Sequence, residues 1–308
     1  MNYNPYWSIY KNLERELVDL SNLIHIDDKQ LEIYSTKISE LLIRTTVEVE
    51  SISKELYFLN GGTKPNDNEL YFDTDCLALL ENKWQLSKKQ ILVSASNFYF
   101  DLVDNKILTP LRKANKRGTS SSDWQRAYQA IKHNKVASLA KGNLKHLIRA
   151  IGGLYILNLY YKDTSYELGK DATGTNFDNS LGSQIFSVKL HINTSISLAS
   201  DYTKKQDFEE CVYLIIPTSE TNKNVHEALK MLNDKTTERT ISNIVDELKK
   251  QLTSTTIINQ EEISKKLKTI AEKMQEDNFL QVAKENGRLL RKAFEGLKYE
   301  AVLNKQQY

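Results

Sequence analysis

Residues 120–135 read SSSDWQRAYQAIKHNK, a stretch that contains both a helix start and a helix end. Ser121, Ser122 and Asp123 are good N-cap candidates, because their side-chain oxygens can accept the unpaired amide protons of a first helical turn. The apolar residues that follow recur at the spacing of one helix face: Trp124, Ala127, Tyr128 and Ile131. The stretch therefore predicts an amphipathic helix with one side packed in a core.

Two polar residues of this helix, Arg126 and His133, share another stripe. A seven-residue step covers about two turns, or ~10 Å along the axis, and returns to nearly the same face. Arginine presents a planar fork of donors that matches phosphate oxygens and keeps its charge. Histidine, with an ordinary pKa of about 6.5, can take and return a proton at neutral pH. Because RNA carries its own nucleophile, the 2′-hydroxyl, such a pair can cleave RNA without a metal.

The spacing of this pair, Arg126-x(6)-His133, resembles the R-x(4–6)-H motif of the HEPN superfamily of small helical proteins. The flanking segments are similar as well. Residues 33–56, IYSTKISELLIRTTVEVESISKEL, resemble an early helix of HEPN-type defence proteins. Residues 143–161, NLKHLIRAIGGLYILNLYY, resemble the long apolar helix that follows the motif. The likeness runs from Leu31 to Tyr161 and covers somewhat under half of the chain.

The resemblance implies a HEPN-like helical bundle and the activity of a metal-independent endoribonuclease that needs no cofactor. Such a protein would act in anti-phage defence by abortive infection, or as the toxin of a toxin–antitoxin system. His133 would be the general base or acid at the 2′-hydroxyl, and Arg126 would stabilise the charge on the phosphate. In the family, two protomers bring their motif helices together. The expected partners are therefore RNA, a second copy of the chain, and an antitoxin or regulatory protein.

The Arg126 and His133 pair has two other interpretations. Many active members of the family carry a polar residue directly after the arginine, whereas this chain has Ala127, and the spacing is at the long end of the family range. A catalytically inactive HEPN-like sensor or adaptor that binds protein or nucleic acid is therefore the alternative. In the third interpretation, Arg126 pairs with an acidic neighbour such as Asp123, and His133 caps its helix.

Basic residues lie on both sides of the motif. Lys132 and Lys135 flank His133 and are candidate phosphate contacts. The segment LRKANKRGTS, residues 111–120, precedes the helix and supplies four more candidates: Arg112, Lys113, Lys116 and Arg117. Such a run is usually a solvated loop. Its place next to the motif helix also suits a patch that steers RNA phosphates toward the site.

The composition bounds the class of protein. The chain has 308 residues, with 40% hydrophobic and 27% charged residues, as in a globular protein. Its net charge of +2 is low for a strong non-specific nucleic-acid binder, although it allows a local basic patch. Cys76 and Cys211 form no disulfide or zinc pattern, so we expect a reducing, cytoplasmic location. We find no signal peptide, and charged residues interrupt the longest apolar stretch, 144–160, so no membrane span is expected.

The remaining patterns predict a mainly α fold in three parts. Residues 1–161 would form the HEPN-like helical domain, with helices near 6–24, 31–58 and 139–161. Residues 162–220 would be a polar loop with a small β-hairpin or sheet, and 221–308 a C-terminal helical region. Residues 91–103 fit a helix about as well as a strand. Residues 186–193 alternate in a strand pattern that places His191 in solvent, and 211–217 predict a second strand.

Inside the third helix, Gly152 and Gly153 predict a close approach by another helix, from the same fold or from a second protomer.

Other chemistries lack their motifs. The chain contains no G-x-x-x-x-G-K-[ST] loop, no G-x-G-x-x-G after a strand and no G-x-S-x-G elbow. Its five histidines include no H-E-x-x-H pair, so the sequence does not indicate a catalytic metal.

Overall fold

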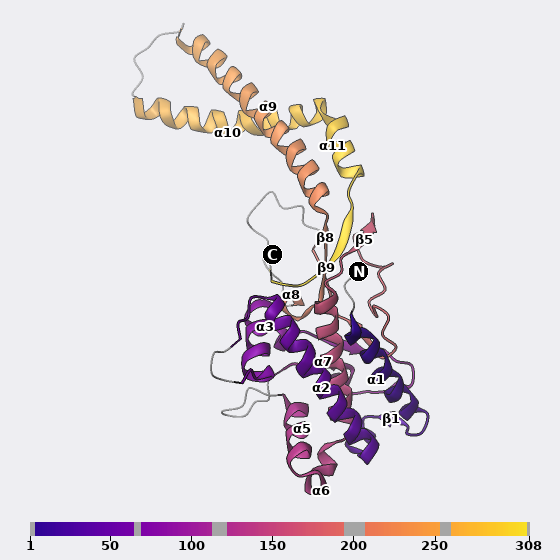
Figure 1. Ribbon diagram of the computed structural model, residues 1–308. Helices are drawn as coiled ribbons and strands as arrows, with labels where there is room; N and C mark the ends of the chain where they lie inside the picture. The colour runs from indigo at the N-terminus through magenta and orange to yellow at the C-terminus, as the bar shows by residue number, and fades with distance from the viewer. Residues whose placement is uncertain (1–3, 65–68, 113–121, 194–206, 253–259, 307–308) are drawn as a thin grey trace.

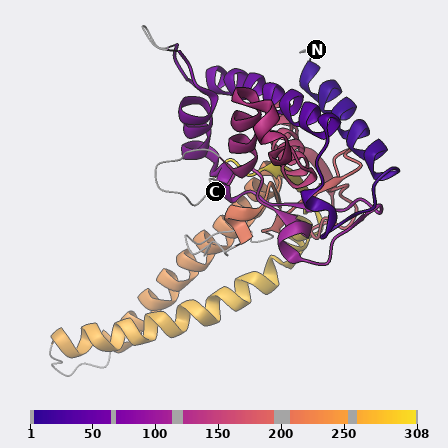
Figure 2. The ribbon, with the colours of Figure 1, turned by 90° about the horizontal axis from the view of Figure 1, so that it is seen from below.

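The computed structural model describes residues 4–64, 69–112, 122–193, 207–252 and 260–306. Within these ranges the chain is mainly helical with small sheets, which confirms the predicted fold class at that level. Figure 1 shows a body built around α1, α2 and α7, and a long arm formed by α9 and α10. Seen from below, the two long helices leave the body on the same side (Figure 2).

The larger helices of the body are α1 (Pro5–Ser21), α2 (Thr36–Leu59), α3 (Leu77–Trp84), α5 (Asp123–His133) and α7 (Leu144–Lys162). Shorter helices are α4 (Val103–Lys106), α6 (Lys135–Ser138) and α8 (Asp207–Glu210), with 3-10 turns at Gln30–Glu32, Leu86–Lys88 and Leu139–Lys141 and a π-helical turn at Phe72–Cys76. The three helices predicted near 6–24, 31–58 and 139–161 are therefore confirmed. Two of them begin later than predicted, because Ser35 and Asn143 provide their N-caps.

The central element is α7, which packs against α1, α2 and α5. From Ala150 to Tyr160 every residue of α7 is buried, so this part of the helix is covered on all sides, and Asn158 is the one amide side chain in it. A helix of this kind needs neighbours around its whole circumference. The ring of Tyr160 stacks on Trp84 with the ring centroids 4.7 Å apart. The predicted core helix is therefore the element on which the body is assembled.

Gly152 and Gly153 admit two neighbours to the surface of α7. A Cβ at Gly152 would lie 2.8 Å from Cδ1 of Ile91, and a Cβ at Gly153 would lie 3.3 Å from Cδ2 of Leu111 and 3.5 Å from Cζ2 of Trp124. The prediction of a close approach is confirmed. The prediction that a helix makes it is wrong at Gly152, where the neighbour is a strand residue, and the contact lies within one chain.

The described residues also form three small sheets. Strands β1 (Ile26–Asp27) and β3 (Phe98–Tyr99) pair in parallel, and β2 (Ile91–Val93) lies between β4 (Ile107–Leu108) and β6 (Phe186–Val188), antiparallel to both. The third sheet has the order β5 (Tyr166–Gly169), β9 (Tyr299–Leu303), β8 (Tyr213–Pro217) and β7 (Leu190–Ile192). The ambiguous 91–103 stretch thus forms strands, and the predicted polar loop after α7 contains one.

The predicted strand over 186–193 is divided between two sheets. Phe186 to Val188 join β2, whereas Leu190 to Ile192 pair in parallel with β8. The prediction that His191 lies in solvent is wrong, because its residue surface is only 2% exposed. Nδ1 of His191 lies 3.0 Å from Oδ2 of Asp207, and α8 covers the ring. The alternation correctly predicted a strand but could not reveal a second covered face.

The arm is inserted between two paired strands. Chain 218–298 leaves the body after β8 and returns into β9, its antiparallel neighbour, through α9 (Ser219–Leu252), α10 (Gln260–Glu285) and α11 (Gly287–Glu295). At its base the amide of Thr218 donates to the carbonyl of Lys298 at 2.9 Å. The C-terminal region predicted as helical, 221–308, is helical over α9, α10 and α11, but it also contains the strand β9, which the prediction missed. The three-part domain division remains an interpretation.

We predict that Gly152→Val lowers the free energy of unfolding by about 1–3 kcal/mol, because the added methyl groups enter space that Ile91 occupies. Thermal or urea unfolding measures the change. The matched control is Gly287→Ala in α11, where an added Cβ meets no atom within 4 Å, and we expect it to cause no loss. Equal stability of Gly152→Val and the wild type would contradict the packing of β2 on α7.

Candidate functional site

Helix α5 presents the predicted site. It follows Ser122, whose amide and hydroxyl donate to Oε1 of Gln125 at 2.5 and 3.0 Å. Nε1 of Trp124 donates to the carbonyl of Pro110 at 2.7 Å and fixes the first turn. The apolar face predicted for the helix is buried: Trp124, Ala127, Tyr128 and Ile131. The helix predicted from 120–135 is therefore confirmed, together with the side that it packs.

Arg126 lies half-buried one turn into α5. Its Nη2 donates to Oδ1 of Asp123 in an i, i+3 ion pair, and its Nε is enclosed without a hydrogen-bond partner. Burial alone would raise the pKa of the Asp123 carboxyl. The hydrogen bond and charge of Arg126, with the charges of His146 and Arg149, outweigh that effect and lower it. Asp123 thus stays ionised and fixes the guanidinium, as the third interpretation predicted for this residue.

His133 is exposed in the last turn of α5, with Lys132 beside it and Asn134 as the C-cap. Cations in this position interact favourably with the carbonyl end of a helix. The side chain of His133 does not cap the helix. The C-cap contact is a backbone one, from the amide of Asn134 to the carbonyl of Ala130. Arg126 and His133 therefore both reach solvent from one helix, separated by about two turns.

The predicted phosphate contacts have different outcomes. Lys132 and Lys135 are exposed on either side of His133, and Nζ of Lys132 lies 5.7 Å from the ring centre of Tyr128. Arg112 is exposed and lies near the other end of α5, where it lines a cleft. Three predicted residues lie outside the described residues: Lys113, Lys116 and Arg117.

This cleft, hereafter the α5–α7 cleft, has a volume of about 360 Å³. It is formed by residues 104–112, by the start of α5 and by Arg149 of α7. Its charged lining residues are Asp104, Arg112, Asp123 and Arg149. The cleft is polar for the most part, and Asp123 joins it to the ion pair of Arg126.

Two residues of α7 near this cleft were not predicted as site residues. His146 and Arg149 are half-buried at an i, i+3 spacing, while Leu147 and Ile148 between them are buried. Nδ1 of His146 lies 2.7 Å from the carbonyl of Lys141, so Nδ1 carries the proton and Nε2 is left as the basic nitrogen. Burial lowers the pKa of His146. The sequence signal was the polar spacing inside an otherwise apolar helix, which we interpreted only as interrupting a membrane span.

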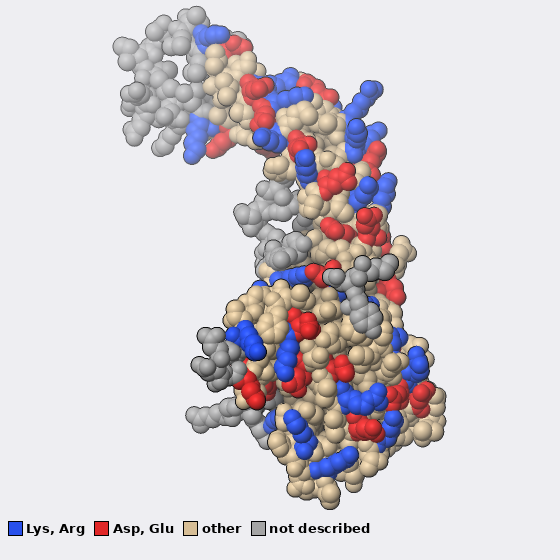
Figure 3. All heavy atoms as spheres, viewed as in Figure 1, with Lys and Arg blue, Asp and Glu red and all other residues tan. Residues whose placement is uncertain are grey.

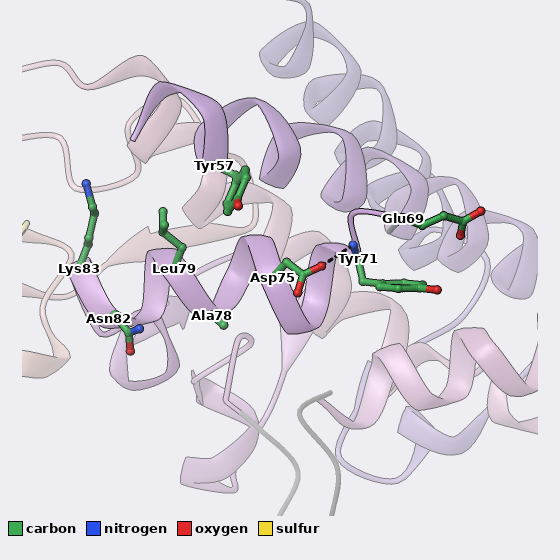
Figure 4. A pocket seen from close by; sticks show the side chains of 8 residues that line it. All are labelled: Tyr57, Glu69, Tyr71, Asp75, Ala78, Leu79, Asn82 and Lys83. Carbon is green, nitrogen blue, oxygen red and sulfur yellow. Dashed lines mark hydrogen bonds between the residues drawn. The ribbon is translucent and has the colours of Figure 1, made fainter. Parts of the chain in front are cut away.

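A second, larger pocket lies away from α5, between the end of α2 and α3. It has a volume of about 620 Å³ and is lined by Tyr57, Glu69, Tyr71, Asp75, Ala78, Leu79, Asn82 and Lys83. Figure 4 shows Tyr57 on α2 facing α3, and Tyr71 directed away from the helix pair. The backbone amide of Tyr71 donates to Oδ2 of Asp75 at 2.8 Å. None of the predicted site residues lines this pocket.

The surface charges are mixed. Figure 3 shows basic and acidic side chains interspersed over the body and the arm in one view. This distribution agrees with the net charge of +2. Any attraction of a polyanion by this face would therefore depend on local groups of basic side chains, such as those at the end of α5.

Within the described ranges, no group of three or more His, Cys, Asp or Glu residues has the arrangement of a metal site. A search of the helices in the same part of the chain found none with the length and hydropathy of a membrane span.

Comparisons with protein-family models, curated proteins and solved structures found no match to this chain.

The exposure of His133 can be tested by chemical modification. We predict that diethyl pyrocarbonate modifies His133 and His226 rapidly, because both are exposed, and His191 slowly, because it is buried. Peptide mass spectrometry over a time course measures the three rates. His226 on α9 is the internal control for an accessible imidazole. A rate for His133 as low as that of His191 would mean that the imidazole is closed to solvent.

Proposed function

We propose that this protein is a metal-independent endoribonuclease of the HEPN type, acting in anti-phage defence or as a toxin. The observation that carries the proposal is that α5 holds Arg126 and His133 on one stripe with both side chains reaching solvent. An imidazole sealed in the core, or a guanidinium on the packed face, would not support it.

The residues divide the chemistry between them. His133 takes the proton of a ribose 2′-hydroxyl, and the 2′-oxygen attacks the adjacent phosphorus. The bond from phosphorus to the 5′-oxygen breaks, and that oxygen takes up a proton, which leaves a 2′,3′-cyclic phosphate and a 5′-hydroxyl. Arg126 stabilises the charge that develops on the phosphate oxygens, because its fork of donors matches them. Asp123 holds the guanidinium through one Nη and leaves other donors for the substrate.

A second copy of the chain supplies the acid. Within one helix the two side chains lie about 10 Å apart along the axis, so one protomer alone separates its base from its charge stabiliser. A homodimer that brings two α5 helices together would place the partner subunit's His133 near the 5′-oxygen and the partner subunit's Arg126 near the base, so that base, acid and charge stabiliser meet at one phosphate. Lys132 and Lys135 are exposed beside His133 and would hold flanking phosphates.

Cleavage of RNA by the purified protein tests the proposal. We predict activity in the presence of EDTA, and a loss of about 100-fold or more in His133→Ala, as expected for removal of a general acid–base group. Arg126→Gln should lose activity comparably, and a single 2′-deoxy substitution at the cleaved position should stop cleavage. His226→Ala, a change of another exposed histidine far along the chain, should match the wild type. Equal cleavage by His133→Ala and the wild type would remove His133 from the mechanism.

A specific observation favours a second candidate, the non-enzymatic sensor or adaptor. One Nη group of Arg126 is already paired with Asp123. The next residue, Ala127, is buried in the core and offers no polar group to a substrate. A growth assay separates the candidates. A ribonuclease should slow growth on overexpression, and His133→Ala or Arg126→Gln should relieve it. An adaptor would show growth that is indifferent to these two substitutions.

A further inference from the structure

Arg149 is the unusual residue of the α5–α7 cleft. It extends from α7, is half-buried and lines the cleft. In the described part of the chain, no hydrogen bond or ion pair engages its guanidinium. Burial lowers the pKa of Arg149, and the charges of Asp123, Asp104 and Glu32 partly oppose this effect. An arginine nevertheless stays charged at neutral pH.

A half-buried guanidinium without a contacting anion lacks the hydrogen bonds and the opposite charge that would compensate its burial. Removing a charge from water is costly unless hydrogen bonds and an opposite charge compensate it. Arg112 lines the same cleft and adds a second guanidinium, which is exposed. Two arginines that converge on one concave site suit a phosphate, because each can donate two parallel hydrogen bonds to its oxygens.

The acidic residues narrow the class of ligand. Asp104 and Asp123 also line the cleft, and Asp123 is already paired with Arg126. Carboxylates repel a bare anion but accept hydrogen bonds from hydroxyl and amino groups. A ligand that carries both a phosphate and such donors satisfies the two kinds of residue. The cleft volume of about 360 Å³ lies at the small end of ligand sites, which span roughly 300–1,000 Å³.

We propose that the α5–α7 cleft binds a single phosphate ester of a nucleoside, with Arg149 and Arg112 on the phosphate and the free carboxylate of Asp104 on a sugar or base donor. Binding of this ligand does not require cleavage chemistry. An RNA chain as the source of that nucleotide does rest on the proposed ribonuclease, because the cleft adjoins the Arg126 end of α5 and would hold a nucleotide next to the one cleaved. A free nucleotide is the other source.

Binding experiments that do not depend on cleavage test the cleft. Titration calorimetry of the full chain would use adenosine monophosphate, inorganic phosphate and a short 2′-O-methyl oligoribonucleotide, which the proposed reaction cannot cut. We expect Arg149→Gln and Arg112→Gln each to weaken binding of the nucleotide or the oligonucleotide about tenfold or more, as for loss of a charge-assisted bond. Arg288→Gln on α11 removes the same charge from an exposed arginine and should leave binding unchanged. Thermal unfolding shows whether each variant is folded. If Arg149→Gln does not fold, Arg112→Gln still tests the cleft, because Arg112 is exposed and its replacement should not disturb the fold.

The outcomes separate this inference from the proposed function. If the protein binds the nucleotide in a way that depends on Arg149 but does not cleave RNA, the nucleotide site is supported and the proposed ribonuclease function is contradicted. The opposite result would be RNA cleavage that requires His133, with nucleotide binding unchanged by substitution of Arg112 or Arg149. That result would support the ribonuclease and contradict the nucleotide site in the cleft. The nucleotide site would also be contradicted if inorganic phosphate bound as tightly as the nucleotide, or if Arg288→Gln lost as much affinity for the nucleotide as Arg149→Gln.

Discussion

The contact that most of this structure depends on is the close approach of other segments to α7 at Gly152 and Gly153. One glycine lets Ile91 of β2 reach the helix, and the other lets Leu111 and Trp124 reach it. Because Trp124 stands in the first turn of α5, this second contact fixes where the motif helix begins. It also brings residues 104–112 against the same face, and these residues form one wall of the α5–α7 cleft.

A helix fixed in this way has two ends with different surroundings. The start of α5 borders the α5–α7 cleft, where exposed Asp123 engages half-buried Arg126, and Arg149 of α7 lines the same cleft. The two half-buried guanidiniums are partly desolvated, which strengthens their interactions with opposite charges. The end of α5 is open, and the imidazole of His133 lies there in solvent between exposed lysines. The proposed ribonuclease uses this contrast. Arg126 at the half-buried start stabilises the phosphate that reacts, whereas His133 at the open end transfers the proton and Lys132 and Lys135 beside it hold flanking phosphates. The arm made by α9 and α10 leaves the opposite side of the body (Figure 1) and has no part in the proposal.

The local patterns of the sequence predicted α5, α7 and the strand β8, because each is encoded by neighbours within a few turns. They could not predict which distant segments come into contact. The alternation in 186–193 indicated a strand, yet α8 buries His191 from the side that the pattern left to solvent. Arg149 was visible only as a polar interruption of an apolar helix. Its relation to Arg112 and Asp123 arises from tertiary packing of α5 on α7, and no spacing within one segment contains that relation. The pairing of Arg126 with Asp123 was among the alternatives, since an i, i+3 offset places the two side chains together.

The most direct test of the account is to observe where RNA touches the protein. Spectra of histidine and arginine side chains in the ¹⁵N-labelled protein, recorded with and without a 2′-O-methyl oligoribonucleotide, report each imidazole and guanidinium separately. The account predicts that the signals of His133 and Arg126 shift together on binding, while that of His226 on the arm stays in place. Shifts confined to the arm, or a His133 signal that RNA leaves unchanged, would contradict it.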